Sequence, residues 1–458
     1  MALDIVIMAA GKGTRMKSAR PKVLHTLAGR SLLQHVLQTA AGLGADRIVV
    51  VTGHGAEQVE ASVAAPDLQF VRQVPQRGTG DAVQQAAPLL HDSGTTLILN
   101  GDVPLIRPET LRALIDACGG AQLALLTVEL EDPHGYGRIV RAGDAVQAIV
   151  EHKDASPAQH TIGEIYTGVM AAPTAPLKRW LAALRDDNAQ REYYRTDVVA
   201  SAVAEGVPVV ATLAPNETEV LGVNSAAQLA DLERRVQRAR ADALMEAGVR
   251  LADPARLDVR GELVCGVDVE IDVDCVFEGR VELGDDVRIG AHCSIRNATI
   301  AAGAVIHPFT HVDGEALGVK IGAGALVGPF ARLRPGADLG AEVHIGNFVE
   351  VKNSTLARGA KANHLAYLGD ATVGERVNYG AGSITANYDG ANKHRTVIGD
   401  DVHVGSNCVL VAPMTVGAGA TIGAGSTLTK EVPAGQLTVA RPKAVSLSGW
   451  TRPVKAKK

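Results

Sequence analysis

The spacing of apolar residues divides the chain into two long segments with different periods. In the first segment, short β-branched runs alternate with helical stretches such as 32–41. The runs lie at 5–8, 48–51, 96–99 and 123–128. This alternation is typical of a parallel sheet covered by helices, and it predicts a Rossmann-like α/β domain over residues 1–224.

A charged helix is predicted next, over residues 225–248. One stripe of this stretch is apolar and the other positions carry many arginines, which suits a helix that connects two domains. The stripe consists of Leu229, Leu232, Val236, Ala239 and Ala243. Gly248, with Pro254 shortly after it, predicts the end of the helix.

Aliphatic residues recur at every sixth position in the remaining segment, 249–458. Two frames hold this period, at Ile321, Val327, Leu333, Leu339, Ile345 and Val351, and at Ile398, Val404, Leu410, Val416, Ile422 and Leu428. Small residues often stand four positions later, at Ala325, Ala331, Ala337, Val402, Cys408, Ala420 and Ser426. Such a period predicts a parallel β-helix that stacks one coil on the next, and we expect the left-handed form built from hexapeptide repeats.

Two irregularities interrupt the six-residue period. The frame slips between Val351 and Leu356, and an insertion leaves the repeat between Ile384 and Thr396. Because interruptions of a solenoid project as loops, we expect functional residues near both of them.

Composition narrows the classes of function. Aromatic residues make up 3% of the chain, which fits a narrow core of Ile, Val and Leu, and the net charge of −5 supplies no general attraction for nucleic acid. The five cysteines form no C-x-x-C pair, so buried free thiols are expected in place of disulfides or a zinc site. The first residues enter an apolar run without a basic leader, and no membrane-length apolar run occurs. We therefore expect a soluble, cytoplasmic protein that binds neither nucleic acid nor membranes.

A glycine-rich loop follows the first predicted strand. Gly11 and Gly13 let backbone N–H groups turn toward an anion, and the N-terminus of a following helix would add its positive dipole. A simple tight turn explains the glycines equally well, while the Walker A and dinucleotide-binding patterns both fail on spacing. Arg15 and Lys22 add two cations, and Asp102 follows a strand at a position suited to holding Mg²⁺ over a triphosphate.

The motifs around this loop carry a resemblance. The run A-A-G-x-G-T-R-M, followed by Pro21-Lys22, resembles the signature of sugar-nucleotide pyrophosphorylases. Later motifs, in order, are similar to the uridylyltransferase half of the bifunctional N-acetylglucosamine-1-phosphate uridylyltransferase/glucosamine-1-phosphate acetyltransferase family. They are Gln73, Gly78-Thr79-Gly80, Gly101-Asp102, Tyr136-Gly137-Arg138, Glu151-His152-Lys153-Asp154 and Gly222-Val223-Asn224.

The resemblance implies a nucleotidyltransferase and assigns roles to its residues. Arg15 and Lys22 would act on the phosphates, and Mg²⁺ would bind Asp102 and Asn224. The contacts to UTP and the product UDP-sugar would come from Met8, Ala9, Ala10, Gly11, Lys22, Gln73, Gly78, Thr79, Asn100, Gly101, Asp102, Gly137, Glu151, Tyr166 and Asn224. Two of these depart from the family pattern, because Asn100 stands where Tyr is common and Tyr166 stands where the motif has Asn. A phenol cannot take the place of the shorter amide at a sugar hydroxyl.

The second half carries a string K-A-x-H-L-x-Y-L-G-D around His364 that resembles the acetyltransferase motif of the same family. Acetyl transfer needs a base, because the amine of glucosamine-1-phosphate is largely an ammonium at neutral pH and must lose a proton before it attacks a thioester. The resemblance implies that His364 is this base and that the enzyme is a homotrimer with acetyl sites between subunits. Glucosamine-1-phosphate and acetyl-CoA would contact Arg334, Lys352, Tyr367, Asn378, Ala381, Asn387, Tyr388, Ser406, Ala424 and Arg441. The cationic tail 452–458 is either solvated or assists a neighbouring site.

Two other functions compete with a bifunctional enzyme. One is a nucleotidyltransferase with a single activity, whose β-helix only holds the oligomer together. The other is a scaffold without catalytic activity that keeps a nucleotide-sensing domain. His364 and the loop with Asn387 and Tyr388 favour two activities.

Overall fold

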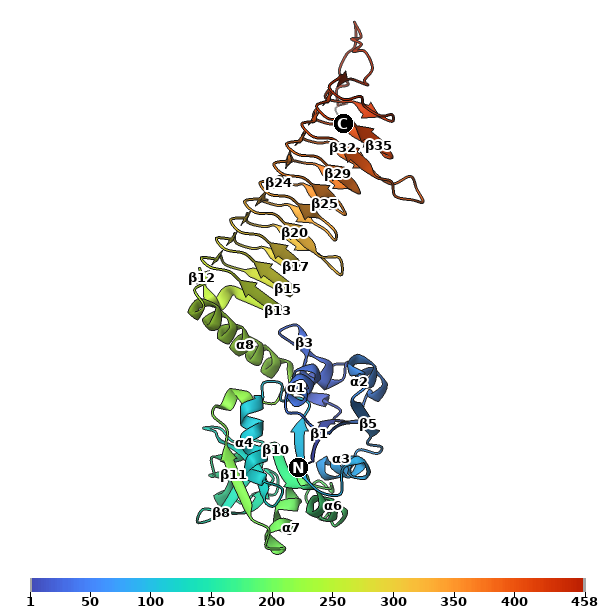
Figure 1. The fold of residues 1–458 in the computed structure, drawn as a ribbon. Helices are drawn as coiled ribbons and strands as arrows, with labels where there is room; N and C mark the ends of the chain where they lie inside the picture. Colours follow the sequence, from blue (N-terminus) through green and yellow to red (C-terminus); the bar gives the residue numbers. More distant parts are fainter. Residues whose placement is uncertain (1, 456–458) are drawn as a thin grey trace. The chain divides into compact units, whose positions relative to one another are not determined.

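The computed structural model describes residues 2–455, and it divides the chain into two compact units (Figure 1). The first unit ends at Val236 and the second begins at Gln237, so the division falls inside helix α8 (Ala226–Glu246). This helix lies where the apolar stripe predicts it. The end of the tail, 456–458, lies outside the described residues.

The first unit is built on a mixed sheet of nine strands. Its main path runs β11-β7-β10-β6-β1-β4-β5, and all neighbours on this path are parallel except β10, which is antiparallel to β6 and β7. The hairpin β8–β9 joins the sheet through β10. The strands are β1 Leu3–Ala9, β4 Arg47–Thr52, β5 Leu68–Arg72, β6 Thr95–Asn100, β7 Leu123–Glu129, β8 Arg138–Ala142, β9 Ala145–Val150, β10 Glu164–Pro173 and β11 Val209–Leu213. The β-branched runs of the sequence correspond to β1, β4, β6 and β7.

Helices cover both faces of this sheet, as the alternation of side chains along β1 shows. Ile5 and Ile7 pack with α1, α2 and α4 on one face, whereas Val6 packs with α3, α6 and α7 on the other. All three side chains have no exposed surface. The helices are α1 Leu32–Ala41, α2 Ala56–Val63, α3 Thr79–Ala86, α4 Pro108–Cys118, α5 Pro157–His160, α6 Thr174–Ala182 and α7 Val198–Ala204. A strand buried on both faces needs continuous apolar residues, and this is what the run 5–8 supplies.

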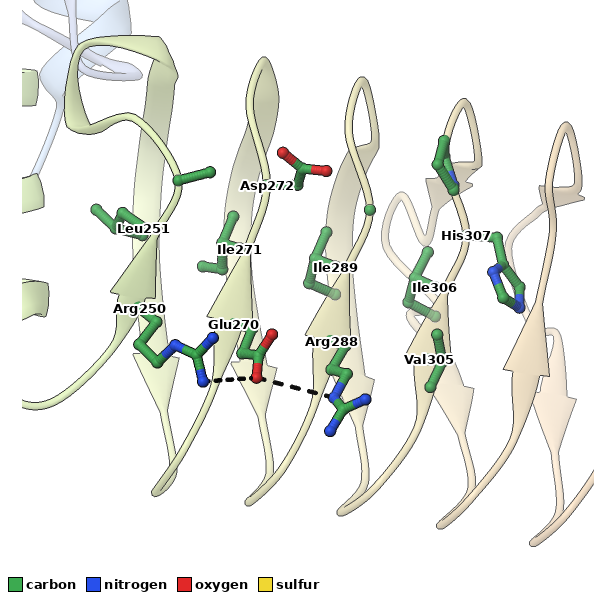
Figure 2. Close-up of a pocket in the computed structure, with 13 residues that line it drawn as sticks. Arg250, Leu251, Glu270, Ile271, Asp272, Arg288, Ile289, Val305, Ile306 and His307 are labelled. Carbon is green, nitrogen blue, oxygen red and sulfur yellow. Dashed lines mark ion pairs between the residues drawn. The ribbon is translucent and has the colours of Figure 1, made fainter.

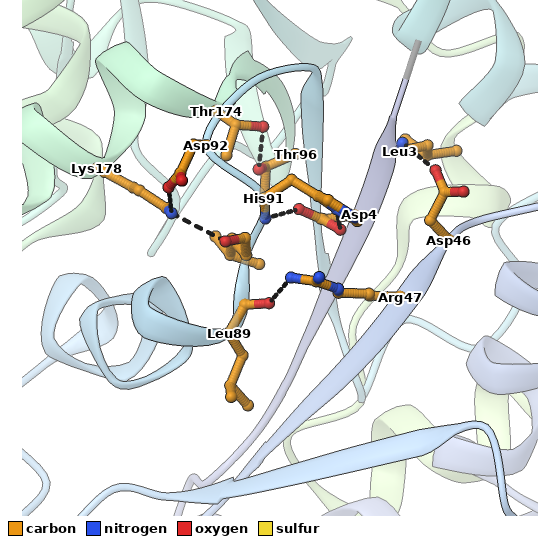
Figure 3. Close-up of polar contacts among 11 residues, drawn as sticks. Leu3, Asp4, Asp46, Arg47, Leu89, His91, Asp92, Thr96, Thr174 and Lys178 are labelled. Carbon is orange, nitrogen blue, oxygen red and sulfur yellow. Dashed lines mark hydrogen bonds and ion pairs between the residues drawn. The ribbon is translucent and has the colours of Figure 1, made fainter.

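Polar contacts fix the edge of the sheet where the parallel strands begin (Figure 3). Asp4, at the start of β1, is 1% exposed, and its carboxylate accepts a hydrogen bond from the backbone N–H of His91 and pairs with its ring, both at 2.7 Å. Thr96 on β6 and Thr174 on α6 share a hydrogen bond of 2.9 Å. These contacts hold the amino ends of the strands and leave the carboxyl ends for a site.

The second unit is a solenoid of short parallel strands. One row contains β12 Arg250–Leu251, β14 Glu270–Ile271, β16 Arg288–Ile289, β18 Val305–Ile306, β21 Leu326–Val327, β24 His344–Asn347, β27 Lys361–His364, β30 Asn378–Tyr379, β33 His403–Val404, β36 Thr421–Ile422 and β38 Leu437–Thr438. The other two rows meet at three long strands, β13 Leu257–Cys265, β15 Cys275–Leu283 and β17 Ser294–Ile300. One of them continues through β20 Val319–Ile321, β23 Asp338–Leu339, β26 Thr355–Leu356, β29 Ala371–Val373, β32 Thr396–Ile398 and β35 Met414–Val416. The other continues through β19 His311–Asp313, β22 Arg332–Leu333, β25 Glu350–Lys352, β28 Tyr367–Gly369, β31 Ile384–Ala386, β34 Val409–Val411 and β37 Thr427–Leu428.

The strand register explains the six-residue period. Val327 pairs with Ile345, which stands three hexapeptides further along the chain, so each regular coil contributes one strand to each row. Every aliphatic residue of the two frames is buried, with at most 5% of its surface exposed, and the small residues four positions later are buried as well. The predicted hexapeptide core is therefore confirmed.

Both predicted irregularities are present. The offset between paired residues shortens by a single position where Leu339 pairs with Leu356, which is the frame slip. It lengthens well beyond three hexapeptides where Tyr379 pairs with Val404, and there the insertion forms a loop after β31 that projects from the coils near β32 (Figure 1).

Successive coils also present charged ladders at the surface (Figure 2). Ile271 and Ile289 stack in the core row, while Glu270 beside them pairs with Arg250 at 3.0 Å and with Arg288 at 4.0 Å. Because these ion pairs are exposed, each contributes about 1 kcal/mol at most, and the aliphatic stack carries the stability.

Four of the five cysteines are buried free thiols, one in the first unit and three in the solenoid. All five cysteines are unpaired, and burial raises the pKa of the Cys275 thiol to about 12. Cys265 alone among the five is half-buried.

Candidate functional site

A cavity of about 470 Å³ opens at the carboxyl ends of β1 and β6 in the first unit. This is the edge of a parallel α/β sheet where ligands bind. Ten residues predicted for the nucleotide line it: Met8, Ala9, Ala10, Gly11, Lys22, Gln73, Gly78, Thr79, Asn100 and Asp102. Residues far apart in the sequence are thus brought to one cavity.

The helix dipole at this cavity comes from a different element than the sequence suggests. The glycine-rich loop enters a single 3-10 turn, Thr14–Met16, instead of an α-helix, because Lys17 adopts a left-handed backbone that ends the turn. The expectation of a helix directly after the loop is wrong. Helix α3 supplies a helix N-terminus instead, since its first residue, Thr79, lines the cavity.

The Lys22 ammonium joins Asp102, which also lines the cavity, to Asn224, which lies outside its wall. The Lys22 ammonium donates to the Asp102 carboxylate and, at 3.1 Å, to the amide oxygen of Asn224. Two oxygens from different segments therefore converge on a single cation. A carboxylate and an amide oxygen are hard ligands, and Mg²⁺ commonly takes one or two such protein ligands beside phosphates and water. The donor set fits Mg²⁺, although no cluster of three or more His, Cys, Asp or Glu side chains suited to a metal occurs in residues 2–455.

Other predicted residues lie outside the wall of the cavity. Arg15 is exposed, and Gly101 precedes Asp102. Gly137 lies against Glu151, and a Cβ at Gly137 would meet the carboxylate of Glu151 at 3.6 Å. Burial raises the pKa of Glu151, and the hydroxyl of Thr196 donates a hydrogen bond to it at 3.1 Å.

Tyr166 also lies outside the wall. Its side chain is 5% exposed, and its hydroxyl has no hydrogen-bond partner among the described residues. The long phenol extends into the core, where burial raises its pKa to about 12. Tyr166 is therefore not among the side chains that line the cavity, and its contact with the sugar stays a prediction.

Several cavity residues were missed by the sequence analysis. The wall also contains Lys12, Val23, Gln76, Ala82, Glu192 and Arg195. Gln76 donates to the carbonyl of Ala10 at 2.5 Å, and the backbone N–H of Arg195 donates to the Thr79 hydroxyl at 3.1 Å. Arg195 belongs to no motif, so only the fold reveals it.

In the second unit, His364 stands at the end of β27 with its ring exposed. Its Nδ1 lies 3.0 Å from Oδ1 of Asn347, the residue at the same position of the preceding coil. An amide oxygen can only accept, so Nδ1 carries the hydrogen and Nε2 keeps its lone pair. This tautomer leaves Nε2 available as a proton acceptor.

A group of cations lies at a second corner of the coils. Contact with the amine of Lys393, followed by burial, lowers the pKa of Lys352, and the charge of Arg334 acts in the same direction. Arg334 itself pairs with Glu350 at 2.8 Å. The inserted loop contributes Lys393, which the sequence analysis missed. Cations held this close together favour an anion such as a phosphate.

Asp370 ties the inserted loop to this corner. The amide of Asn387 donates to its carboxylate, and the amide of Asn353 does so at 2.6 Å. Tyr388 lies further along the loop with 60% of its surface exposed, and Tyr367 begins β28 next to the corner.

The residues predicted for acetyl-CoA follow one edge of the solenoid above His364. The Gly382 N–H donates to the carbonyl of His364, and the chain then rises coil by coil through three contacts. Asn407 N–H donates to Ala381 O at 2.7 Å, Gly425 N–H to Ser406 O at 2.8 Å, and Arg441 Nη1 to Ala424 O at 2.7 Å. Asn378 stands on the adjoining row, at the start of β30. A long ligand could contact this edge over several coils.

The residues predicted for acetyl transfer therefore lie at two corners of the coils. Strand β28, Tyr367–Gly369, runs between His364 and Asp370. His364 and the cation group are therefore on opposite sides of this strand.

The fold and these sites define a transferase with two active centres, a nucleotidyltransferase unit joined to a hexapeptide-repeat unit. Comparison with known proteins agrees with this class. Residues 5–247 match the family described as the MobA-like NTP transferase domain, and residues 318–353 and 395–430 match the bacterial transferase hexapeptide family.

Full-length relatives identify the family. The bifunctional protein GlmU of Methylibium petroleiphilum is 76% identical over 462 residues, covering 99% of each chain. Those of Paracidovorax citrulli and Cupriavidus pinatubonensis are 68% and 60% identical and cover at least 99% of each chain. The chain belongs to the GlmU family. It is a bifunctional enzyme with a uridylyltransferase half and an acetyltransferase half, and the alternative of a single activity is not supported.

Within residues 2–455, no helix has both the length and the apolar character that crossing a bilayer requires.

Proposed function

We propose that the second unit acetylates glucosamine-1-phosphate from acetyl-CoA, and that the first unit then joins the product to UMP from UTP and releases pyrophosphate. The observation that carries the nucleotidyl half is the convergence of Asp102 and Asn224 on the ammonium of Lys22 at the cavity. The acetyl half rests on the Nδ1 contact between His364 and Asn347.

In the first unit, the reaction depends mainly on the alignment of the substrates and the neutralisation of their phosphate charge. The phosphate of the sugar is already an anionic nucleophile, so its in-line attack on the α-phosphorus of UTP needs no strong base. Backbone N–H groups at Gly11 and at the start of α3 would hold phosphate oxygens, and Lys22 and Arg15 would offset their charge. Gln73, Gly78 and Thr79 would hold the nucleotide, while Gly137 and Glu151 would face the sugar.

Mg²⁺ fits the oxygens of Asp102 and Asn224, where it would neutralise phosphate charge. The Lys22 ammonium, which bridges those oxygens in the structure, would then be free to turn toward a phosphate.

In the second unit, Nε2 of His364 would take the proton of the substrate amine as nitrogen attacks the thioester carbonyl. The C–S bond then breaks, the acetyl group remains on nitrogen as an amide, and coenzyme A leaves as a thiolate that takes up a proton. Arg334, Lys352 and Lys393 would hold the sugar phosphate. Acetyl-CoA would extend along the edge that leads from Ala381 to Arg441.

We further propose that the active enzyme is a homotrimer. Exposed rings form a ladder beside His364, with Phe309, Phe330 and Phe348 stacked at 5.0 and 5.5 Å between centroids. Leu365 stands next to His364 and continues this row of exposed apolar side chains, with 61% of its surface exposed. A continuous apolar edge suits contact with another copy, which would bring the cation group of one chain to His364 of the next. The free thiols fit a reducing compartment, and we propose the cytoplasm.

Chelation of metal tests the two halves together. EDTA should abolish formation of the UDP-sugar from UTP and N-acetylglucosamine-1-phosphate, while acetylation of glucosamine-1-phosphate continues at its full rate. Loss of both reactions would refute separate sites, and absence of acetylated sugar with or without metal would refute the acetyl half.

A further inference from the structure

Arg195 is a buried cation in the wall of the nucleotide cavity that the proposed reaction leaves without a role. It begins a short turn, Arg195–Asp197, and only 4% of its surface is exposed. The hydroxyl of Thr79 fixes its backbone from helix α3 at 3.1 Å. Its position is therefore set by the same helix that begins at the cavity.

The charge of Arg195 is poorly compensated within the protein. Nη1 lies 3.4 Å from the sulfur of Met8, which is a weak acceptor, and Nε has no hydrogen-bond partner among residues 2–455. No carboxylate among residues 2–455 lies close enough to Arg195 to form an ion pair with its guanidinium. Glu151 acts on it only at longer range, and burial raises the pKa of Glu151 toward the neutral form. Since burying an unpaired guanidinium is costly, a ligand that supplies acceptors would stabilise this arrangement.

Tyr166 provides the support for this guanidinium. The Arg195 guanidinium carbon lies 5.4 Å from the centroid of the Tyr166 ring, a distance at which the face of an aromatic ring attracts a cation. Gly168 on the same strand lets the guanidinium pack closely. A Cβ at this position would meet Nη2 of Arg195 at 3.4 Å and would overlap the amide of Asn100. Strand β10 thus holds the guanidinium against the cavity beside Asn100.

We propose that Arg195 is a specificity-determining residue of uridylyl transfer, which donates hydrogen bonds to acceptor oxygens of the sugar 1-phosphate. This inference rests on the proposed function of the first unit. A guanidinium only donates hydrogen bonds and always carries a positive charge. It would therefore bind the oxygen-rich acetylated sugar and repel the ammonium of the unacetylated sugar.

The test uses the full-length chain with Arg195→Gln and Arg195→Lys. Loss of a charge-assisted contact should raise KM for N-acetylglucosamine-1-phosphate about tenfold or more in Arg195→Gln, while KM for UTP changes less than about twofold. The preference for the acetylated over the unacetylated sugar phosphate, as a ratio of kcat/KM, should fall. Arg195→Lys should restore the discrimination against the ammonium sugar in part, because it keeps the charge but not the planar fork.

The controls separate the possible failures. Arg185→Gln, which removes an arginine elsewhere in the same segment, should leave both KM values unchanged. An unchanged sugar KM in Arg195→Gln, or equal changes in both KM values with a lowered melting temperature that Lys does not rescue, would overturn the proposal. Failure of the proposed function would differ, because the unmodified enzyme would then form no UDP-sugar at all.

Discussion

The contact between His364 and Asn347 predicts how a single charge would change acetyl transfer. In Asn347→Asp, a carboxylate would replace the amide oxygen that lies 3.0 Å from Nδ1. Opposite charges about 4 Å apart attract by about 1 kcal/mol in a solvent-exposed setting such as this, which corresponds to about 0.7 pH unit. The carboxylate favours the imidazolium, so a higher pH is needed to free the lone pair of Nε2. The acid limb of the rate profile should move upward by about 0.5 to 1 pH unit.

The assay is the release of coenzyme A thiol, followed from about pH 5 to 9 with saturating substrates, because the acid limb reports the base. Asn363→Asp is the matched control, because it adds the same charge one residue from His364 without a hydrogen bond to its ring, and its shift should be smaller. Uridylyl transfer should not change in either variant. A limb that stays in place or moves to lower pH in Asn347→Asp would refute the assignment of His364 as the base.

Three further outcomes follow from buried residues and from the inserted loop. Leu333→Ala should lower the free energy of unfolding of the solenoid by about 2 to 5 kcal/mol in denaturant, because the side chain is fully buried. The control Leu317→Ala, at a position 74% exposed, should change it by less than about 0.5 kcal/mol. Burial raises the pKa of Glu151, so its ionised form opposes folding at neutral pH. Glu151→Gln should therefore raise the melting temperature at about pH 7.5. The gain should shrink toward about pH 4, where the carboxyl is largely protonated in both the folded and the unfolded state. An unchanged difference across this pH range would contradict the burial argument. Lys393→Met should raise KM for glucosamine-1-phosphate several-fold without affecting KM for acetyl-CoA, and an equal rise in both would place Lys393 outside the phosphate site.

The sequence predicts the architecture well because each fold imposes its own period. Residues 5–8 must be apolar throughout to be buried on both faces of a sheet. In the solenoid, an aliphatic residue must follow Val327 after six positions, at Leu333, to fill the next face of a coil. The slip at Leu356 and the inserted loop are visible as breaks in the same period. None of this requires knowledge of tertiary contacts.

Contacts made across coils or between distant strands cannot be read from the sequence in the same way. Asn347 reaches His364 only because the strand register places them side by side on neighbouring coils, across the frame slip. Lys393 reaches Lys352 because the inserted loop folds back, and Arg195 reaches Tyr166 through a turn that carries no motif. Sequence position alone also does not show that the Tyr166 hydroxyl is buried and that its ring lies beside Arg195.

The division of labour between the two units is tested most directly by measuring both reactions in Asp102→Ala and in His364→Ala. We predict that Asp102→Ala loses uridylyl transfer and keeps acetyl transfer, and that His364→Ala does the reverse. Loss of both reactions in either variant, or retention of both, would contradict a division between two separate sites.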